Sequence, residues 1–543
     1  MLTGNCQAIS AICLGSMTYG YILSIISTTL GQPHFYTYFG LVADPTASNY
    51  SYTASIIGAI NGLLSAGGVF GSCFMAWMSE ARGRKPSLVA ATVVALVGCI
   101  LQTASVHIAM FLVARFVTGL GAGMLITLVP IFQAEISPPS TRGFFVAQNG
   151  VIIVSAYSIA AWVGVGCYYA TNPDFQWRFP LALQCLWPLL MLIAMPVIPE
   201  SPRWMLFQDR RDEAWNIISK LHGASSSQQL FAREEFYQIS RQAEADKLLR
   251  AQEGLLDLFR KPSYRKRMFC AFVTMFAAQG SGNLVIYSES SLNRTLARAN
   301  ILNDYSVLLY QGLGQTGGVP LILGASYCTI AAVLNYVCAL LIDRVGRVRL
   351  MIIGLIGCIL CLAIESALVA EYAGTDNKAG LSAGVFILFF YILFYAGCID
   401  ATTYVYCAEI FPTHIRAKGM AFSIIVLYAC TIPYLQAAPY AFASIGWKYY
   451  LVFISLTTLC VPIILMTFPE TKGFSLEEIN EKFGDQVEVH LTHITTEEKV
   501  VLDIEVESND RGAAGAEVGT SLAKESDQGH SHYENLVTTP AKI

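Results

Sequence analysis

The stretch "AEISPPSTRG", residues 134–143, places an acid, Glu135, seven positions before a base, Arg142, with proline between them. The stretch "AEIFPTHIRAKG", residues 408–419, does the same with Glu409 and Arg416. The acid and the base of the second stretch each follow their counterparts by 274 positions. Repetition at a fixed offset indicates a chain that contains two similar structural units.

Two further pairs of motifs follow the same plan. The motif "PESPRW" at 199–204 is echoed by "PETKG" at 469–473, and "SEARGRKP" at 79–86 is echoed by "IDRVGRVR" at 342–349. Each pair comes after the second, fourth or sixth apolar segment of its half. Three repeats in register predict two six-helix halves. Paired bundles of this kind are typical of transporters that bind a solute between them.

The composition is that of an integral membrane protein. The 543 residues are 54% hydrophobic and only 13% charged, whereas soluble proteins carry about 25% charged residues. Uncharged runs approach the roughly 20 residues that cross a bilayer, where backbone groups must be paired within a helix. We predict an all-α membrane fold with twelve transmembrane helices at 8–30, 54–78, 87–105, 109–132, 145–169, 180–198, 267–288, 307–341, 350–370, 380–407, 419–441 and 448–468.

Positive charge gathers in the connections on one side of the predicted membrane. By the positive-inside rule that side is cytoplasmic, which also places both termini in the cytoplasm. The sequons at Asn49 and Asn293 fall in connections on the other side, where glycosylation occurs. The basic residues that set this orientation are Arg82, Arg84, Lys85, Arg142, those within 203–267, Arg344, Arg347, Arg349, Arg416 and Lys418.

The predicted organisation has five parts: a cytoplasmic N-terminus at 1–7, a first half at 8–199, a linker at 200–266, a second half at 267–468 and a cytoplasmic tail at 469–543. Most of the tail is polar, a composition typical of disorder. The motif "HSH" at 530–532 is too isolated to indicate a metal site, and the sequence has no phosphate-binding loop. We expect no metal, cofactor, nucleic-acid partner or catalytic activity, and a lipid bilayer around the helices.

The repeated charged motifs predict a cytoplasmic gate. Acids and bases at neighbouring helix ends form salt bridges in one state of a transporter and break them in the other. A plainer interpretation is that the motifs end helices and place charge near the membrane surface, but their repetition in register favours the gate. The residues assigned to it are Arg115, Glu135, Arg142, Glu200, Arg203, Asp343, Arg344, Arg347, Glu409 and Arg416.

These motifs resemble the sugar porter family of the major facilitator superfamily, in places its fungal branch. The resemblance covers about residues 10–475 and includes "RFVTGLGAGM", "WRFPLALQ" and "DRVGR". It implies the twelve-helix fold and the transport of a sugar or polyol. It also implies that Gln148, Gln279, Asn283 and Tyr287 face the solute. Amides suit hydroxyl groups because they both donate and accept, although a polar contact between helices is the alternative.

The first span, "GSMTYGYILSIIS" at 15–27, departs from that family. Proton-coupled relatives carry an acid after Gly-Tyr, which pairs with the arginine that opens the fourth span. Here Ile22 takes the place of the acid, while the arginine is present as Arg115. Because isoleucine cannot bind a proton, the departure favours facilitated diffusion, or coupling through another group.

The tenth span, "FYAGCIDATTYVYCAEIF" at 394–411, supplies a candidate for that group. A carboxylate inside a span is costly and marks a functional site by default. Asp400 could bind solute hydroxyls, carry a proton, bind a cationic solute, or lie at a wet helix end without a role. Tyr404 takes the position of a pocket aromatic. A second acid, Glu365, is expected to make a polar contact between helices.

The sequence therefore predicts a multi-pass plasma-membrane transporter of a sugar or polyol, working by alternating access as a facilitator or a proton symporter. Two alternatives stay open. The departures at Ile22 and Asp400 motivate a transporter of a non-sugar solute such as an organic acid or a secondary metabolite. A sugar sensor that signals through its tail is the other alternative.

Overall fold

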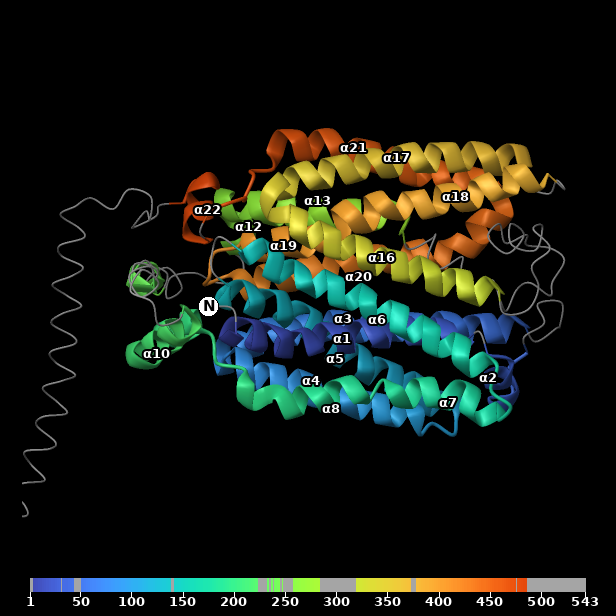
Figure 1. Ribbon diagram of the computed structural model, residues 1–543, viewed down its shortest axis with the longest axis horizontal. Helices are drawn as coiled ribbons and strands as arrows, with labels where there is room; N and C mark the ends of the chain where they lie inside the picture. Colours follow the sequence, from blue (N-terminus) through green and yellow to red (C-terminus); the bar gives the residue numbers. More distant parts are fainter. Residues whose placement is uncertain are drawn as a thin grey trace, which may run out of the picture.

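The computed structural model describes residues 3–30, 32–42, 50–137, 141–222, 232–233, 236–237, 239–244, 247, 257–283, 319–372, 377–474 and 476–485. The predicted all-α membrane fold is confirmed. Within these ranges, eleven helical segments are long and apolar enough to span a membrane, and they run side by side along the long axis of the molecule (Figure 1).

The first half of the chain forms six spans. Its sixth span is interrupted after Leu183, because Pro188 lacks the N–H that would bond the carbonyl four residues earlier. A short helix, α2 (Pro33–Tyr38), follows the first span. The spans are α1 (Thr3–Leu30), α3 (Tyr50–Arg82), α4 (Arg84–Thr103), α5 (Ile108–Ile136), α6 (Arg142–Tyr168), and α7 (Pro173–Leu183) with α8 (Leu186–Ala194) and η1 (Met195–Val197).

The second half repeats this arrangement. Its first helix, α13 (Pro262–Gly280), takes the place of the predicted seventh span, and residues 284–318 lie outside the described ranges. The tenth span contains a π-helical turn, η2 (Tyr395–Asp400), between α18 (Lys378–Phe394) and α19 (Ala401–Glu409). The other spans are α16 (Val319–Val345), α17 (Arg347–Tyr372), α20 (Arg416–Ile445), and η3 (Gly446–Lys448) with α21 (Tyr449–Thr467).

Besides α2, four short helices of the described chain lie outside the spans. Figure 1 shows α10, α12 and α22 at one end of the bundle, which we call the linker end, and α2 at the opposite end. The end of α1 nearest the N-terminus lies at the linker end too. The four helices are α9 (Pro202–Phe207), α10 (Arg211–His222), α12 (Asp257–Arg260) and α22 (Leu476–Lys482).

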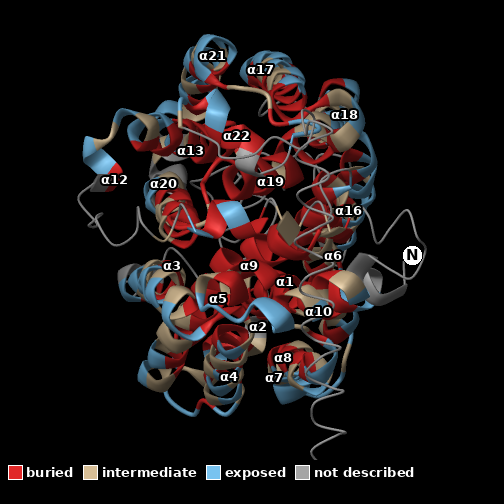
Figure 2. Ribbon diagram, turned by 90° about the vertical axis from the view of Figure 1, so that its left-hand side faces the viewer, coloured by how far each residue is buried: buried red, intermediate tan, exposed pale blue. Residues whose placement is uncertain are grey.

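The largest contacts between the two halves involve two pairs of helices. Seen from the linker end, the helices of each half form one group, with α3 against α20 on one side and α6 against α16 on the other (Figure 2). Buried residues concentrate where the groups meet. Motion of one half relative to the other therefore has to change these two contacts.

Glycines allow unusually close packing within the first half. A Cβ atom at Gly119 of α5 would lie 2.2 Å from the carbonyl oxygen of Leu64 in α3, and one at Gly123 would lie 2.1 Å from that of Gly68. Small residues at this spacing let membrane helices approach backbone to backbone. The motif "RFVTGLGAGM" therefore has a packing role, and it fixes α5, which carries Glu135.

Candidate functional site

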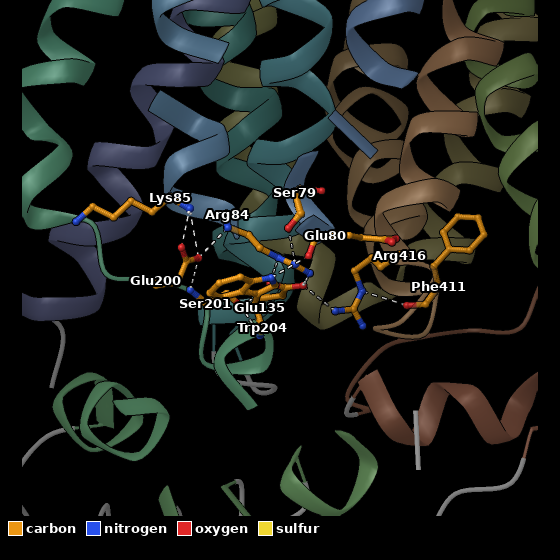
Figure 3. Close-up of polar contacts among 10 residues, drawn as sticks. All are labelled: Ser79, Glu80, Arg84, Lys85, Glu135, Glu200, Ser201, Trp204, Phe411 and Arg416. Carbon is orange, nitrogen blue, oxygen red and sulfur yellow. Dashed lines mark hydrogen bonds and ion pairs between the residues drawn. The ribbon is translucent and has the colours of Figure 1, made fainter. Parts of the chain in front are cut away.

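At the linker end of the first half, Glu135 at the end of α5 pairs with Arg84 at the start of α4 (Figure 3). Arg84 Nε donates to Glu135 Oε2 at 2.9 Å, and Arg84 Nη2 donates to Oε1 at 2.8 Å. The hydroxyl of Ser201 also donates to Oε2. All three residues are buried. This bidentate pair therefore joins two helices and the segment after the sixth span.

Glu200 binds the first turn of α4. It accepts hydrogen bonds from the backbone N–H groups of Arg84, at 2.8 Å, and Lys85, at 3.1 Å. These N–H groups have no partner within the helix, and the positive end of the helix dipole favours a carboxylate. Burial raises the pKa of Glu200, and hydrogen bonds from backbone N–H groups oppose that shift. The acid of "PESPRW" is thus a helix cap.

The second half contains the same arrangement. Arg347 Nε and Nη2 donate to Glu409 at 3.1 and 2.8 Å. The hydroxyl of Thr471 donates to Glu409 at 2.7 Å, and Glu470 accepts from the backbone N–H groups of Arg347 and Val348 at 2.8 and 3.1 Å. The repeated motifs of the sequence therefore correspond to a repeated set of hydrogen bonds.

A glycine with positive φ precedes each of these arginines. Gly83 has φ 96° and Gly346 has φ 106°. A Cβ atom would lie 2.7 Å from Glu200 Oε2 at the first position and 2.6 Å from Glu470 Oε2 at the second. Both the backbone conformation and the position of the capping carboxylate therefore require glycine.

Ion pairs between described residues connect the halves on the α3–α20 side. Glu135 Oε1 lies 3.5 Å from Arg416 Nη1, and Glu80 Oε2 lies 3.4 Å from Lys418 Nζ. Figure 3 shows Glu135 between Arg84 of its own half and Arg416 of the other. The bundle is therefore held closed at the linker end by charge pairs as well as by packing.

The equivalent contact on the α6–α16 side uses a backbone group. Asp343 of α16 accepts a hydrogen bond from the N–H of Phe144 at 2.7 Å, in the first turn of α6, and pairs with Arg347 at 3.0 Å. A Cβ atom at Gly143 would lie 2.0 Å from Asp343 Oδ1. The acid of one half thus caps a helix of the other, at a distance that only glycine permits.

The assignment of Arg115 to this gate is wrong. Arg115 precedes Glu135 by twenty positions on the same helix, which is about 30 Å at 1.5 Å per residue. It is buried towards the opposite end, where its Nε donates to the carbonyl oxygen of Ile60 at 3.3 Å. Its two Nη atoms have no hydrogen-bond partner among the described residues. Charge and motif alone did not distinguish the two ends of the helix.

The remaining gate candidates differ in their surroundings. Arg142, at the start of α6, and Arg203, in α9, are both buried. Arg344 is exposed, and its backbone carbonyl accepts a hydrogen bond from Lys472. A side-chain role for Arg344 in closing the bundle therefore stays a prediction.

The amides assigned to the solute come from both halves of the chain. Gln148 is half-buried on α6 and donates to the carbonyl oxygen of Phe144 at 3.4 Å, in its own helix. Gln279 is buried in the last turn of α13, and Asn283 is half-buried just beyond it. Their part in solute binding stays a prediction. Three other predicted positions, Tyr287, Asn49 and Asn293, lie outside the described residues.

Asp400 and Tyr404 occupy the junction between η2 and α19. Asp400 is half-buried, and its Oδ2 accepts a hydrogen bond from Asn335 Nδ2 of α16 at 3.0 Å. Tyr404 is buried one turn further along, within electrostatic reach of Asp400. The two residues therefore form one polar and aromatic group inside the membrane-spanning part of the protein.

Several residues of these clusters, among them Arg84, Glu470 and Asn335, are missing from the sequence-based assignments. Arg84 and Glu470 could have been found by extending the repeat, because they correspond to Arg347 and Glu200. Asn335 is a lone amide in an apolar run, and only the fold places it beside Asp400.

Comparison with known proteins gives one family. The family model described as "Sugar (and other) transporter" matches residues 8–483. The MFS-type transporter criB of Aspergillus cristatus is 29% identical over 486 residues, which cover 90% of this chain and 94% of that protein. The sugar transporter STL1 of Saccharomyces cerevisiae is 28% identical, with coverage of 88% and 81%. The high-affinity glucose transporter of Kluyveromyces lactis is 26% identical, with coverage of 88% and 84%.

Solved structures share the fold. The proton:xylose symporter XylE bound to 6-bromo-6-deoxy-D-glucose aligns with a TM-score of 0.75 at 20% identity, covering 88% of this chain and 99% of that one. The inward open conformation of XylE from E. coli aligns with a TM-score of 0.59 at 20% identity, covering 87% and 98%. The helices thus have the arrangement of the major facilitator fold, with which the predicted twelve spans agree.

Proposed function

Because the chain belongs to the sugar (and other) transporter family, we propose that it carries a sugar or polyol across the membrane by alternating access. The fold supplies two halves with equivalent clusters, Arg84 with Glu135 and Arg347 with Glu409. Relatives named as sugar and glucose transporters support the choice of solute.

The observation that carries this proposal is the contact of Glu135 with Arg416 across the two halves. A contact of this kind closes one end of a solute path and must break when that end opens. The pair formed by Glu135 and Arg84 lies within one half, so it can persist while the halves move. The gate therefore has a fixed part and a part that opens.

We further propose that the linker end faces the cytoplasm and that the protein resides in the plasma membrane. The positive-inside rule supports this orientation, since Arg84, Arg347 and Arg416 all lie at that end. Both termini are then cytoplasmic, and the sequons at Asn49 and Asn293 face outside.

For the solute we propose a site formed by Gln148, Gln279, Asn283 and Tyr404. Gln148 lies two residues before Gly150, where a Cβ atom would approach Ala401, the neighbour of Asp400, to 2.8 Å. Amide groups suit hydroxyls, and a buried tyrosine suits the apolar face of a sugar ring.

Uptake in a yeast strain without its own hexose carriers tests the proposal. The strain would express the wild type or the variant Gly143→Val, which fills the space occupied by Asp343. A panel of radiolabelled hexoses, pentoses, disaccharides and polyols would be offered with and without a protonophore. We expect saturable uptake of at least one member by the wild type only. Surface expression without uptake of any member would overturn the proposal.

A further inference from the structure

Asp400 is a membrane-embedded acid with a neutral partner. Within the described part of the chain, no Arg, Lys or His forms an ion pair with it, and its recorded hydrogen bond comes from the Asn335 amide. A carboxylate inside a span without a cation is held much less firmly in its charged form than one in an ion pair. Asp400 lies at the end of the π-helical turn. Single π-helical turns within α-helices are frequent at functional sites.

The Asn335 side chain can form a hydrogen bond with Asp400 in its charged form and in its protonated form. Its side chain is buried, and its Nδ2 also donates to the carbonyl oxygen of Ala331 at 3.3 Å. Its Oδ1 has no partner among the described residues. A protonated Asp400 is a donor, and rotation of the amide by half a turn presents Oδ1 to that proton. The pair therefore stays hydrogen-bonded with or without the proton.

The groups that face Asp400 leave its charge uncompensated. Cys338 of α16, Tyr395 of η2 and Tyr404 of α19 lie within electrostatic reach of the carboxylate. Thiol and phenol groups carry no charge near neutral pH. Among the described residues, Asp400 is thus the group of this cluster that can gain or lose a proton near neutral pH.

The cluster lies at the contact between the two halves. Ala401, next to Asp400, is packed so tightly against α6 that a Cβ atom at Gly150 would lie 2.8 Å from its Cα atom. A change of charge at Asp400 therefore acts where α6 of the first half meets the tenth span. That contact is one of those that must change when the halves rock.

We propose that Asp400 is the proton-binding site that couples transport to a proton gradient, in place of the acid absent at Ile22. This inference rests on the proposed function. A proton from the side of higher proton concentration adds to the carboxylate, which becomes a neutral acid bonded to Asn335. With Asp400 neutral and the solute bound, the protein changes to the state that is open on the other side. The proton then returns to water there. One proton thus moves with each solute.

Proteoliposomes containing the wild type, Asp400→Asn, Asp400→Glu or Glu365→Gln test this inference. Glu365 of α17 is the matched control, because it is a buried membrane acid whose two oxygens have no partner among the described residues. The probe is the radiolabelled sugar that the wild type takes up best in the yeast panel. Two quantities are measured: accumulation driven by a gradient of one pH unit, and exchange of internal for external sugar at equal pH.

We expect the wild type and Glu365→Gln to accumulate sugar several-fold, up to the about tenfold limit that one pH unit allows for one proton per sugar. Asp400→Asn should reach equal concentrations on both sides, yet exchange sugar within about threefold of the wild-type rate. Asp400→Glu should regain part of the accumulation, because it restores a titratable group.

Several outcomes would overturn the inference. Accumulation by Asp400→Asn places the proton elsewhere, and loss of accumulation in Glu365→Gln alone places it at Glu365. Loss of both accumulation and exchange in Asp400→Asn makes Asp400 a solute-binding or structural residue. A wild type that exchanges sugar without accumulating it is a facilitator, which refutes coupling but keeps the proposed function. A wild type that transports no sugar refutes both.

Discussion

Glu135 of the first half lies 3.5 Å from Nη1 of Arg416 of the second half, and both side chains are fully buried. The same carboxylate is held within its own half by Arg84, through two hydrogen bonds of 2.8 and 2.9 Å. The contact within the half is therefore short and bidentate, while the contact between halves is long and single. This difference is what a gate requires, because the weaker contact breaks first and leaves no unpaired buried carboxylate.

Substituting the two arginines should separate these roles. Arg416→Gln keeps Glu135 paired, so we expect thermal stability near that of the wild type and an uptake rate reduced about tenfold through a less populated closed state. Arg84→Gln removes the bidentate partner of a buried carboxylate, which typically costs about 3–5 kcal/mol. We expect that variant to have a markedly lower Tm in detergent. An equal loss of Tm in both variants would contradict the division of roles.

The pair of Glu80 and Lys418 predicts a rescue by charge exchange. In the wild type, Glu80 Oε2 lies 3.4 Å from Lys418 Nζ. Either single reversal, Glu80→Lys or Lys418→Glu, replaces this ion pair with two like charges and should weaken closure at the linker end. The double variant restores an opposite pair. We expect uptake to fall several-fold in each single variant and to recover in the double variant, which is the signature of direct coupling. Additive losses in the double variant would show that the two side chains do not act on each other.

The sequence predicted features that repeat between the two halves better than it predicted which buried helix faces meet. The repeat of Glu135 with Glu409 predicted that matching charged motifs take the same place in both halves, but it did not assign their partners Arg84 and Glu470. The assignment of Arg115 was wrong because charge and motif do not show at which end of a helix a residue lies. The pairing of Asp400 with Asn335 spans 65 positions, and a purely apolar periodicity does not say which faces of two buried helices meet.

The glycines with positive φ predict a matched series of alanine variants. Gly83→Ala and Gly346→Ala add a Cβ atom within 2.7 Å of a capping carboxylate, whereas Gly446→Ala, at φ 53°, meets no atom within 4 Å. Gly83, at φ 96° and ψ 173°, lies in a backbone region that essentially only glycine adopts, whereas φ 53° at Gly446 lies in the left-handed range, where another residue costs about 1–2 kcal/mol. We expect only the first two to lose helix capping as well and to have a clearly lower Tm than Gly446→Ala. Equal Tm values in the series would show that the capping contacts add little.

The contact of Asp343 with α6 predicts that a single methyl group blocks transport. Gly143→Ala places a Cβ atom 2.0 Å from Asp343 Oδ1 and 2.4 Å from Arg347 Nη2, so the two halves cannot close as they do in this structure. Gly166→Ala, on the same helix, meets no atom within 4 Å and serves as the control. Both substitutions favour the helix by about 1 kcal/mol, so propensity cancels in the comparison. We expect the uptake rate of Gly143→Ala to be at least tenfold below that of Gly166→Ala at equal surface expression. Equal rates would mean that closure of the linker end tolerates a displaced Asp343, and that the hydrogen bond to Phe144 is not part of the gate.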